Sequence, residues 1–367
     1  MIRRILILGG MGIGMTFAQT PAPKVYQAAP GETMGGEKLD PSYKVPKTAW
    51  GDPDLQGKWP LNHLIAVGLQ RPAKYGDQLF LSDAEYNAAK QTLEARNKRF
   101  DGASVPVADI SQRVMRQTSL IVDPPNGQFP PLTDYGKQLQ AEMRSSYRPG
   151  QTVFDNPADF AAWDRCITRG MPVSMEPRNY NNGIRIMQSP GYVVILLEMA
   201  HEARVIPVNK MPALDSHIEQ WLGESRGHWE GNTLVVETKN FNGLVGETSA
   251  GVPGSPRPLE PETPEMTTVE RFTRVSKDEI DFQMTISDPK VLATGSYTIA
   301  YPMFLDNSYE QFEYACHEGN TAVRHYIETS RYEREHPSEF PAAPAGGRGR
   351  GGRGRGPGQG QAPPPEQ

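Results

Sequence analysis

Cysteine is scarce in this chain, long apolar runs are missing, and several enzyme motifs do not occur. Only two of the 367 residues are cysteines, which excludes a cysteine-rich scaffold or a four-thiolate zinc site. No apolar stretch reaches the roughly 20 residues that a membrane-spanning helix needs. No H-E-x-x-H motif is present, and the one glycine-rich loop lies at the extreme N-terminus. We therefore expect neither a bound metal nor another cofactor.

Charge is distributed unevenly along the chain. The whole chain carries −5, the first 18 residues carry +2 and residues 341–367 carry +3, which leaves −10 for the middle part. An acidic body offers no basic surface to a phosphate backbone, so nucleic acid is not an expected partner.

The N-terminus has the three-part layout of a secretory signal peptide. Arg3 and Arg4 form the charged part, residues 5–17 are uncharged and mostly apolar, and Thr16-Phe17-Ala18 supplies the cleavage site. We expect cleavage after Ala18 and a mature protein in the bacterial periplasm or outside the cell.

Composition divides the rest of the chain into four parts. Residues 19–47 form a flexible leader, and residues 339–367 form a Pro/Gly/Arg-rich tail that is predicted to be disordered. Residues 48–184 mix helical and strand patterns within the same domain, and Ser82 with Glu85 is predicted to cap a helix. Residues 185–338 alternate with period two between turn clusters, which is typical of strands.

Nine short candidate strands follow one another without a helix-length gap, which indicates antiparallel pairing. They span 185–188, 192–199, 204–208, 227–230, 233–238, 268–275, 279–287, 297–301 and 311–317. So many strands need a barrel or a sandwich to hide their edges. We predict a mainly β protein, an antiparallel β-barrel of the calycin or lipocalin type with a smaller helical N-terminal cover.

The two cysteines, Cys166 and Cys316, both belong to the predicted mature part. In an oxidising compartment two well-placed cysteines usually pair, so we predict a disulfide; two buried free thiols are the alternative.

A series of strings occurs in order along the mature chain. They are TAWGDPDLQGKW (48–59), RP (71–72), TSLIVDPPNG (118–127), RC (165–166), PGYVVILL (190–197), GESRGHWEG (223–231), ERF (270–272) and YACHEGN (314–320). Together they resemble a large family of secreted bacterial proteins, over nearly all of the chain except leader and tail. The resemblance implies an exported single-domain protein and no family-wide reaction.

Ionisable residues follow the apolar strand predicted over 192–199, where the inside of a barrel meets its mouth. Glu198, Glu202 and Arg204 share one face of an extended chain, and a bulge near Ala200 would bring His201 to it. Glu198 or His201 is then a candidate general acid or base, and Arg204 a candidate for binding an anionic group. The alternative is a buried Glu–Arg pair.

A second group ends the last predicted strand. The disulfide would fix the backbone beside His317 and Glu318, which makes both of them acid–base candidates, and would hold Arg169 close by. Arg169 and Asn320 are candidate substrate-binding residues. The alternative is that these side chains only satisfy the backbone of a turn.

A third group surrounds Arg226, which we expect to be an internal charge partner that binds substrate. Gly223, Ser225 and Gly227 match G-x-S-x-G, but a nucleophile elbow needs a strand before it and a helix after it, and here a strand follows. A serine hydrolase is therefore disfavoured.

These residues favour a cofactor-independent acid–base enzyme, such as a lyase, decarboxylase or isomerase, acting on a small, partly apolar, anionic or phenolic molecule. The alternative is a non-catalytic periplasmic protein that binds an apolar small molecule. A structural envelope protein attached through its Arg-rich tail is a third class. Catalysis requires a carboxylate or imidazole that faces the pocket, whereas binding does not.

Overall fold

The computed structural model describes residues 25–26, 28, 30–100, 113–178, 180–245, 247–248, 255 and 259–339. The predicted signal peptide, the first residues of the predicted leader and nearly all of the predicted tail lie outside these ranges. Among the described residues, no helix is both long and apolar enough to cross a membrane.

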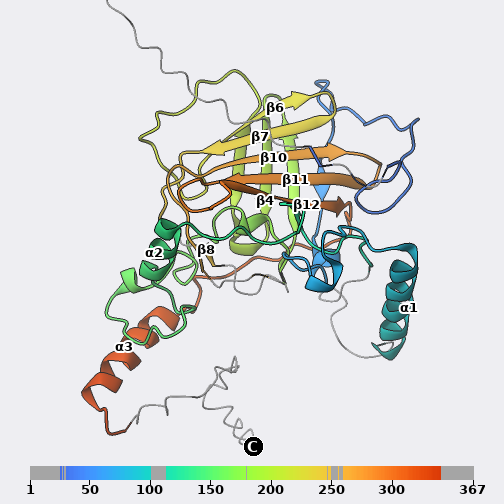
Figure 1. The fold of residues 1–367 in the computed structure, drawn as a ribbon. Helices are drawn as coiled ribbons and strands as arrows, with labels where there is room; N and C mark the ends of the chain where they lie inside the picture. Colours follow the sequence, from blue (N-terminus) through green and yellow to red (C-terminus); the bar gives the residue numbers. More distant parts are fainter. Residues whose placement is uncertain are drawn as a thin grey trace, which may run out of the picture.

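Two antiparallel sheets form the centre of the molecule (Figure 1). The first has the strand order β1-β3-β4-β5, the second has the order β2-β12-β11-β10-β7-β6, and β8 pairs with β9 alone. The strands are β1 (Gly57–Lys58), β2 (Ile121–Asp123), β3 (Ile184–Ser189), β4 (Tyr192–Leu197), β5 (Ala203–Pro207), β6 (Glu224–Glu230), β7 (Thr233–Lys239), β8 (Glu247–Thr248), β9 (Leu259–Glu260), β10 (Thr267–Arg274), β11 (Glu279–Ser287) and β12 (Ser296–Phe304).

The prediction of a mainly β, antiparallel protein is confirmed. The closed barrel is not detected, because the described strands are hydrogen-bonded as separate sheets. Tight turns fix the register of paired strands at positions where the sequence contains turn residues. Glu230 pairs with Thr233 across a two-residue turn that begins with Gly231, and Gly231 has a φ of 61°, which glycine adopts without steric cost.

The α-helices are α1 (Asp83–Phe100), α2 (Asp134–Glu142) and α3 (Ala322–Glu335). The predicted cap of α1 is present, because the Ser82 amide donates to Glu85 Oε2 at 2.9 Å and the Glu85 amide donates to Ser82 Oγ at 3.3 Å. The strand predicted over 311–317 is wrong, since this segment is irregular and leads into α3, which the sequence pattern did not reveal.

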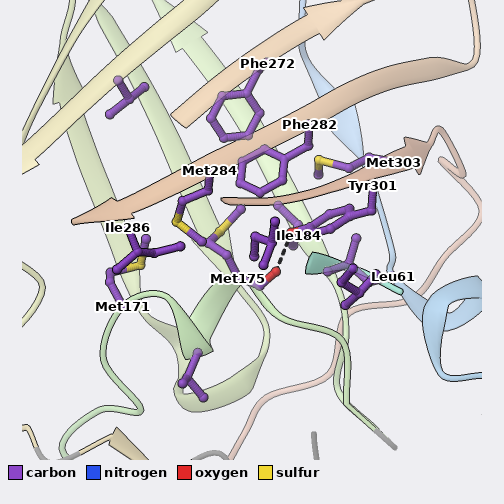
Figure 2. Close-up of a cluster of buried hydrophobic side chains, with 14 of the residues drawn as sticks. Leu61, Met171, Met175, Ile184, Phe272, Phe282, Met284, Ile286, Tyr301 and Met303 are labelled. Carbon is purple, nitrogen blue, oxygen red and sulfur yellow. Dashed lines mark hydrogen bonds between the residues drawn. The ribbon is translucent and has the colours of Figure 1, made fainter. Parts of the chain in front are cut away.

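The largest hydrophobic core unites the inner faces of both sheets (Figure 2). Phe272, Phe282 and Tyr301 face one another across neighbouring strands, with ring centres 4.8 Å apart in each pair. Ile184 of β3 belongs to the same core. The Tyr301 hydroxyl donates to the Met175 carbonyl, which satisfies the one polar group in this aromatic row.

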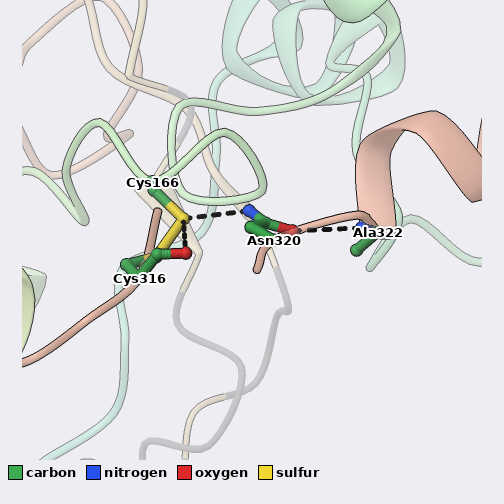
Figure 3. The surroundings of a disulfide bond; sticks show 4 residues. All are labelled: Cys166, Cys316, Asn320 and Ala322. Atoms are coloured by element: carbon green, nitrogen blue, oxygen red, sulfur yellow. Dashed lines mark hydrogen bonds between the residues drawn. A yellow bond between two sulfur atoms is a disulfide. The ribbon is translucent and has the colours of Figure 1, made fainter. Parts of the chain in front are cut away.

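The predicted disulfide between Cys166 and Cys316 is confirmed (Figure 3). The two Cα atoms lie 5.7 Å apart, within the range that a disulfide requires. The bond joins the irregular segment before α3 to the loops that precede β3, so it brings residues far apart in the sequence to one end of the molecule.

Candidate functional site

Glu198 lies directly after β4, is buried, and has its carboxylate occupied by four donors. They are Asn181 Nδ2 at 3.1 Å, the Gly183 amide at 2.9 Å, the Tyr309 hydroxyl at 2.7 Å and the Phe312 amide at 3.1 Å. This carboxylate therefore anchors the irregular segment 309–312 against the first sheet.

The chain turns sharply after Glu198, near the position where a bulge was expected. Ala200 has a φ of 58° and His201 a φ of 40°, so both residues are in the left-handed region. This turn leaves His201 exposed and places Glu202 inside. Glu202 is therefore buried together with Glu198 and Arg204, whose face it was expected to share, although it was not named as a site candidate.

Arg204 lies on β5 and forms a buried ion pair with Glu270 of β10, so the pair connects the two sheets. Arg204 Nη1 donates to Glu270 Oε1 at 2.8 Å, and Nη2 donates to the second carboxylate oxygen and, at 3.1 Å, to Ser225 Oγ. The side chains are only 2% and 0% exposed. The buried partner of Arg204 is thus Glu270, which the sequence analysis did not name.

The second predicted group lies at the surface. His317 and Glu318 are exposed, and they do not end a strand. Asn320 is exposed as well; its Nδ2 lies 3.1 Å from Cys166 Sγ and its Oδ1 accepts from the Ala322 amide at 3.1 Å (Figure 3). The structure brings these residues to the disulfide but not to Glu198.

Arg226 is half-buried on β6 and has its partners nearby in sequence. Its Nε donates to Glu224 Oε1 at 2.7 Å, and its terminal nitrogens donate to the carbonyls of Met211 and Pro212. It holds the loop between β5 and β6, and it lies apart from the residues that line the cavity described next.

A small polar cavity lies between Glu202 and the loop before β3. Its lining includes Glu176, Arg178, Ser174, Arg169, Asn181 and Glu198. The cavity has a volume of about 20 Å³. This is enough for about one water molecule.

Glu176 is the unusual group in this cavity. Its side chain is buried, and its Oε2 has no hydrogen-bond partner among the described residues. Burial raises the pKa of Glu176 to about 7, because the positive charge of Arg178 only partly offsets the lost hydration and Glu260 adds a like charge.

Glu202 shares the cavity with Glu176. The Ser174 hydroxyl donates to Glu202 Oε2 at 2.9 Å. Burial raises the pKa of this carboxyl as well, and the hydrogen bonds that it accepts oppose the rise without cancelling it. Two buried carboxyl groups with raised pKa values therefore line one small cavity.

A larger open hollow lies beside the disulfide, with a volume of about 580 Å³. Its walls include Tyr147, Trp163, Tyr314 and Tyr326, and the rings of Trp163 and Tyr314 lie 5.9 Å apart. Burial raises the pKa of Tyr314 to about 12, and its neighbour Tyr180 adds to the rise. Tyr314 therefore stays neutral at physiological pH.

The hollow and the polar cavity are neighbours. Asn181 lines both of them. Arg169 lines the cavity and stacks on the ring of Trp163, a wall of the hollow, with its guanidinium carbon 3.7 Å from the ring centre. Arg169 is thus the one predicted substrate-binding residue that lies between the two spaces.

Sequence reasoning missed Glu176 and the aromatic walls. Trp163 lies three residues before Cys166, so the predicted disulfide was a usable signal for it. Glu176 follows no periodic pattern, and only burial by distant segments distinguishes it. No group of three His, Cys, Asp or Glu side chains within the described ranges is placed to hold a metal ion.

Comparisons with protein-family models, with curated proteins and with solved structures found no match to this chain.

Proposed function

We propose that this chain is an exported, cofactor-independent acid–base enzyme that acts on a small, partly aromatic molecule. The observation that carries the proposal is Glu176, a buried carboxyl with an unpartnered oxygen in a polar cavity next to a ligand-sized hollow. Perturbed carboxyl groups in such settings are characteristic of catalytic sites.

The chemistry follows from the environment of Glu176. A carboxyl group with a pKa of about 7 is present in both protonation states near neutral pH, so it can take up a proton and return it. Arg178 lies close enough to interact with this carboxyl and supplies a positive charge for an anion that forms beside it. Glu202 provides a second proton-holding group in the same cavity.

The two spaces suggest how a substrate is divided between them. The hollow falls within the 300–1,000 Å³ that is usual for small-molecule sites, and its Tyr and Trp walls suit a flat ring. The inner cavity admits only a group of about the size of water. A phenol or enol whose ring occupies the hollow and whose acidic substituent or adjacent C–H points at Glu176 fits this division. The reaction is then a proton transfer of the isomerase or lyase kind.

A non-catalytic binding protein is the second candidate. The difference in volume between the hollow and the small cavity favours it, because a ligand can occupy the hollow without contacting the cavity.

The test combines binding with proton exchange. Quenching of tryptophan fluorescence, to which Trp163 contributes, measures binding of a panel of phenolic and aromatic keto acids, and NMR in D₂O measures deuterium uptake into each compound. The wild-type protein should bind a member of the panel and label it. Glu176→Gln should bind without labelling, whereas the exposed control Glu237→Gln should do both. Binding without labelling by the wild type would favour the second candidate, and labelling by Glu176→Gln would remove Glu176 from the mechanism.

Export and a calycin-type barrel complete the proposal. Secretion is supported by the disulfide, because such bonds persist in oxidising compartments. The barrel is supported by the contact between β5 and β6, the strands that end the first and second sheets.

A further inference from the structure

Residues 30–39, which we call the N-terminal strap, are held by side chains of one strand of the second sheet. The Gly35 amide donates to Glu279 Oε1 at 2.7 Å, the Thr33 hydroxyl to Glu279 Oε2 at 2.9 Å, and the Met34 amide to Asp281 Oδ1 at 3.2 Å. Glu279 and Asp281 belong to β11, so two carboxyl groups of β11 fix the backbone of the strap.

The strap approaches the sheet very closely at Gly35. A Cβ atom at this position would lie 2.7 Å from Phe304 Cζ and 2.8 Å from Glu279 Oε1, and real Cβ atoms do not come that close. A side chain at this position would force the Phe304 ring and the Glu279 carboxylate to shift. The docking of the strap is therefore specific and can be disturbed by one methyl group.

The two carboxyl groups that hold the strap are themselves in contact. Glu279 and Asp281 are two positions apart on β11, so their side chains share the face opposite Phe282. The two side chains are close enough to hydrogen-bond to each other when one of them carries a proton. Burial raises the pKa of Asp281 to about 8 and the charge of Glu279 adds to the rise, while the hydrogen bond from the Met34 amide opposes it. Burial also raises the pKa of Glu279.

Charged side chains of neighbouring segments surround this pair. Arg113 faces Glu279 and stacks on Phe304, with its guanidinium carbon 3.8 Å from the ring centre. On the strap, Glu32 lies 3.9 Å from Arg116, which pairs with Asp83 at 2.8 Å.

The neighbouring strands contribute no further group that titrates near neutral pH. Thr273 of β10 and Pro302 of β12 lie directly opposite Asp281. Arg271, further along β10, pairs with Glu230 at 2.8 Å. Burial lowers the pKa of His63, which contacts Phe304, to about 4, so this histidine is neutral above that pH.

We propose that the strap is a proton-dependent latch, which docks on β11 while Glu279 and Asp281 hold one proton between them and is released when both are ionised. The docked state retains a proton that the released carboxyl groups lose above their ordinary pKa of about 4. Docking therefore weakens as pH rises from about 4 to about 8, by up to about tenfold per pH unit, and changes no further above that. Release would remove one wall of the half-open hollow of about 320 Å³ that the strap and the sheet line together.

Hydrogen exchange of the Met34 and Gly35 amides, at about pH 5 and about pH 9, tests the latch. Asp281→Asn is the decisive variant, because an asparagine still accepts from the Met34 amide and donates to Glu279 without needing a proton. Since intrinsic exchange changes equally in both proteins, the ratio of the wild-type rate to the variant rate isolates docking. We expect this ratio to rise at least tenfold between the two pH values. Glu279→Gln should remove the pH dependence in the same way.

Two further variants make the result decisive. Asp278→Asn, at an exposed position beside β11, should behave as the wild type. Gly35→Ala should lose protection of the Met34 amide at both pH values, while the Phe282 amide stays protected and reports an intact sheet. A constant ratio between wild type and Asp281→Asn would overturn the proposal, as would full protection of Met34 in Gly35→Ala.

Discussion

Removing one partner of the buried ion pair between Arg204 and Glu270 should destabilise the protein far more than removing any surface ion pair. Glu270→Gln keeps the shape of the side chain but leaves the guanidinium of Arg204 without a counter-charge. The two side chains are 2% and 0% exposed, so water cannot replace the lost partner. We expect a loss of about 3–5 kcal/mol in the free energy of unfolding, and Arg204→Met should cost a similar amount.

The double variant Arg204→Met/Glu270→Gln should recover most of that loss, because it removes both buried charges together. Urea unfolding of the four proteins measures the free energies, and the difference between the double variant and the sum of the single variants gives the coupling. Glu230→Gln is the matched control. Glu230 pairs with Arg271, the neighbour of Glu270, at 2.8 Å but is 51% exposed, so its loss should cost less than about 1 kcal/mol. If Glu270→Gln cost no more than this control, the inference that the pair connects the two sheets energetically would be refuted.

Four other predictions follow. Replacing both Cys166 and Cys316 by alanine should lower the free energy of unfolding by about 5 kcal/mol, since the bond closes a loop between residues 150 positions apart; two alkylatable thiols in the secreted protein would contradict the bond. Glu176 binds its proton more tightly in the folded state than in the unfolded chain. The free energy of unfolding should therefore fall by about 3 kcal/mol as pH rises from about 4.5 to the folded pKa of about 7, and urea titrations of Glu176→Gln at pH values on either side should lack that fall. N-terminal sequencing of the exported protein should begin at Gln19, and an intact Met1 would refute cleavage. Deleting residues 340–367, which contain few apolar side chains, should leave the melting temperature nearly unchanged, and a clear drop would show that this segment packs.

Local patterns were sufficient for the parts of the fold that depend on neighbouring residues. Alternating apolar positions predicted β10, β11 and β12, because side-chain direction in a strand depends only on residue parity. The turn at Gly231 and the cap at Ser82 were likewise predictable from their residue types. The cysteine pairing followed from their number and from the expected oxidising compartment.

The same local reasoning went wrong where irregular backbone was involved. A bulge near Ala200 was expected to bring His201 to the face of Glu198, Glu202 and Arg204, but the left-handed turn at Ala200 leaves His201 exposed. The segment 311–317 alternates like a strand, yet it finds no partner strand and stays irregular, with His317 exposed. Strand formation requires a neighbour that sequence periodicity does not supply.

Short-range geometry and composition were enough to predict the β-rich class, most strand positions and the pairing of the cysteines. The roles of the ionisable groups depend on contacts that form only when the chain is folded. Arg204 became an internal counter-charge and Glu198 an anchor for segment 309–312, since distant segments supply their partners. Glu176 became the candidate acid–base group because packing removes its water, and desolvation is a property of the assembled fold.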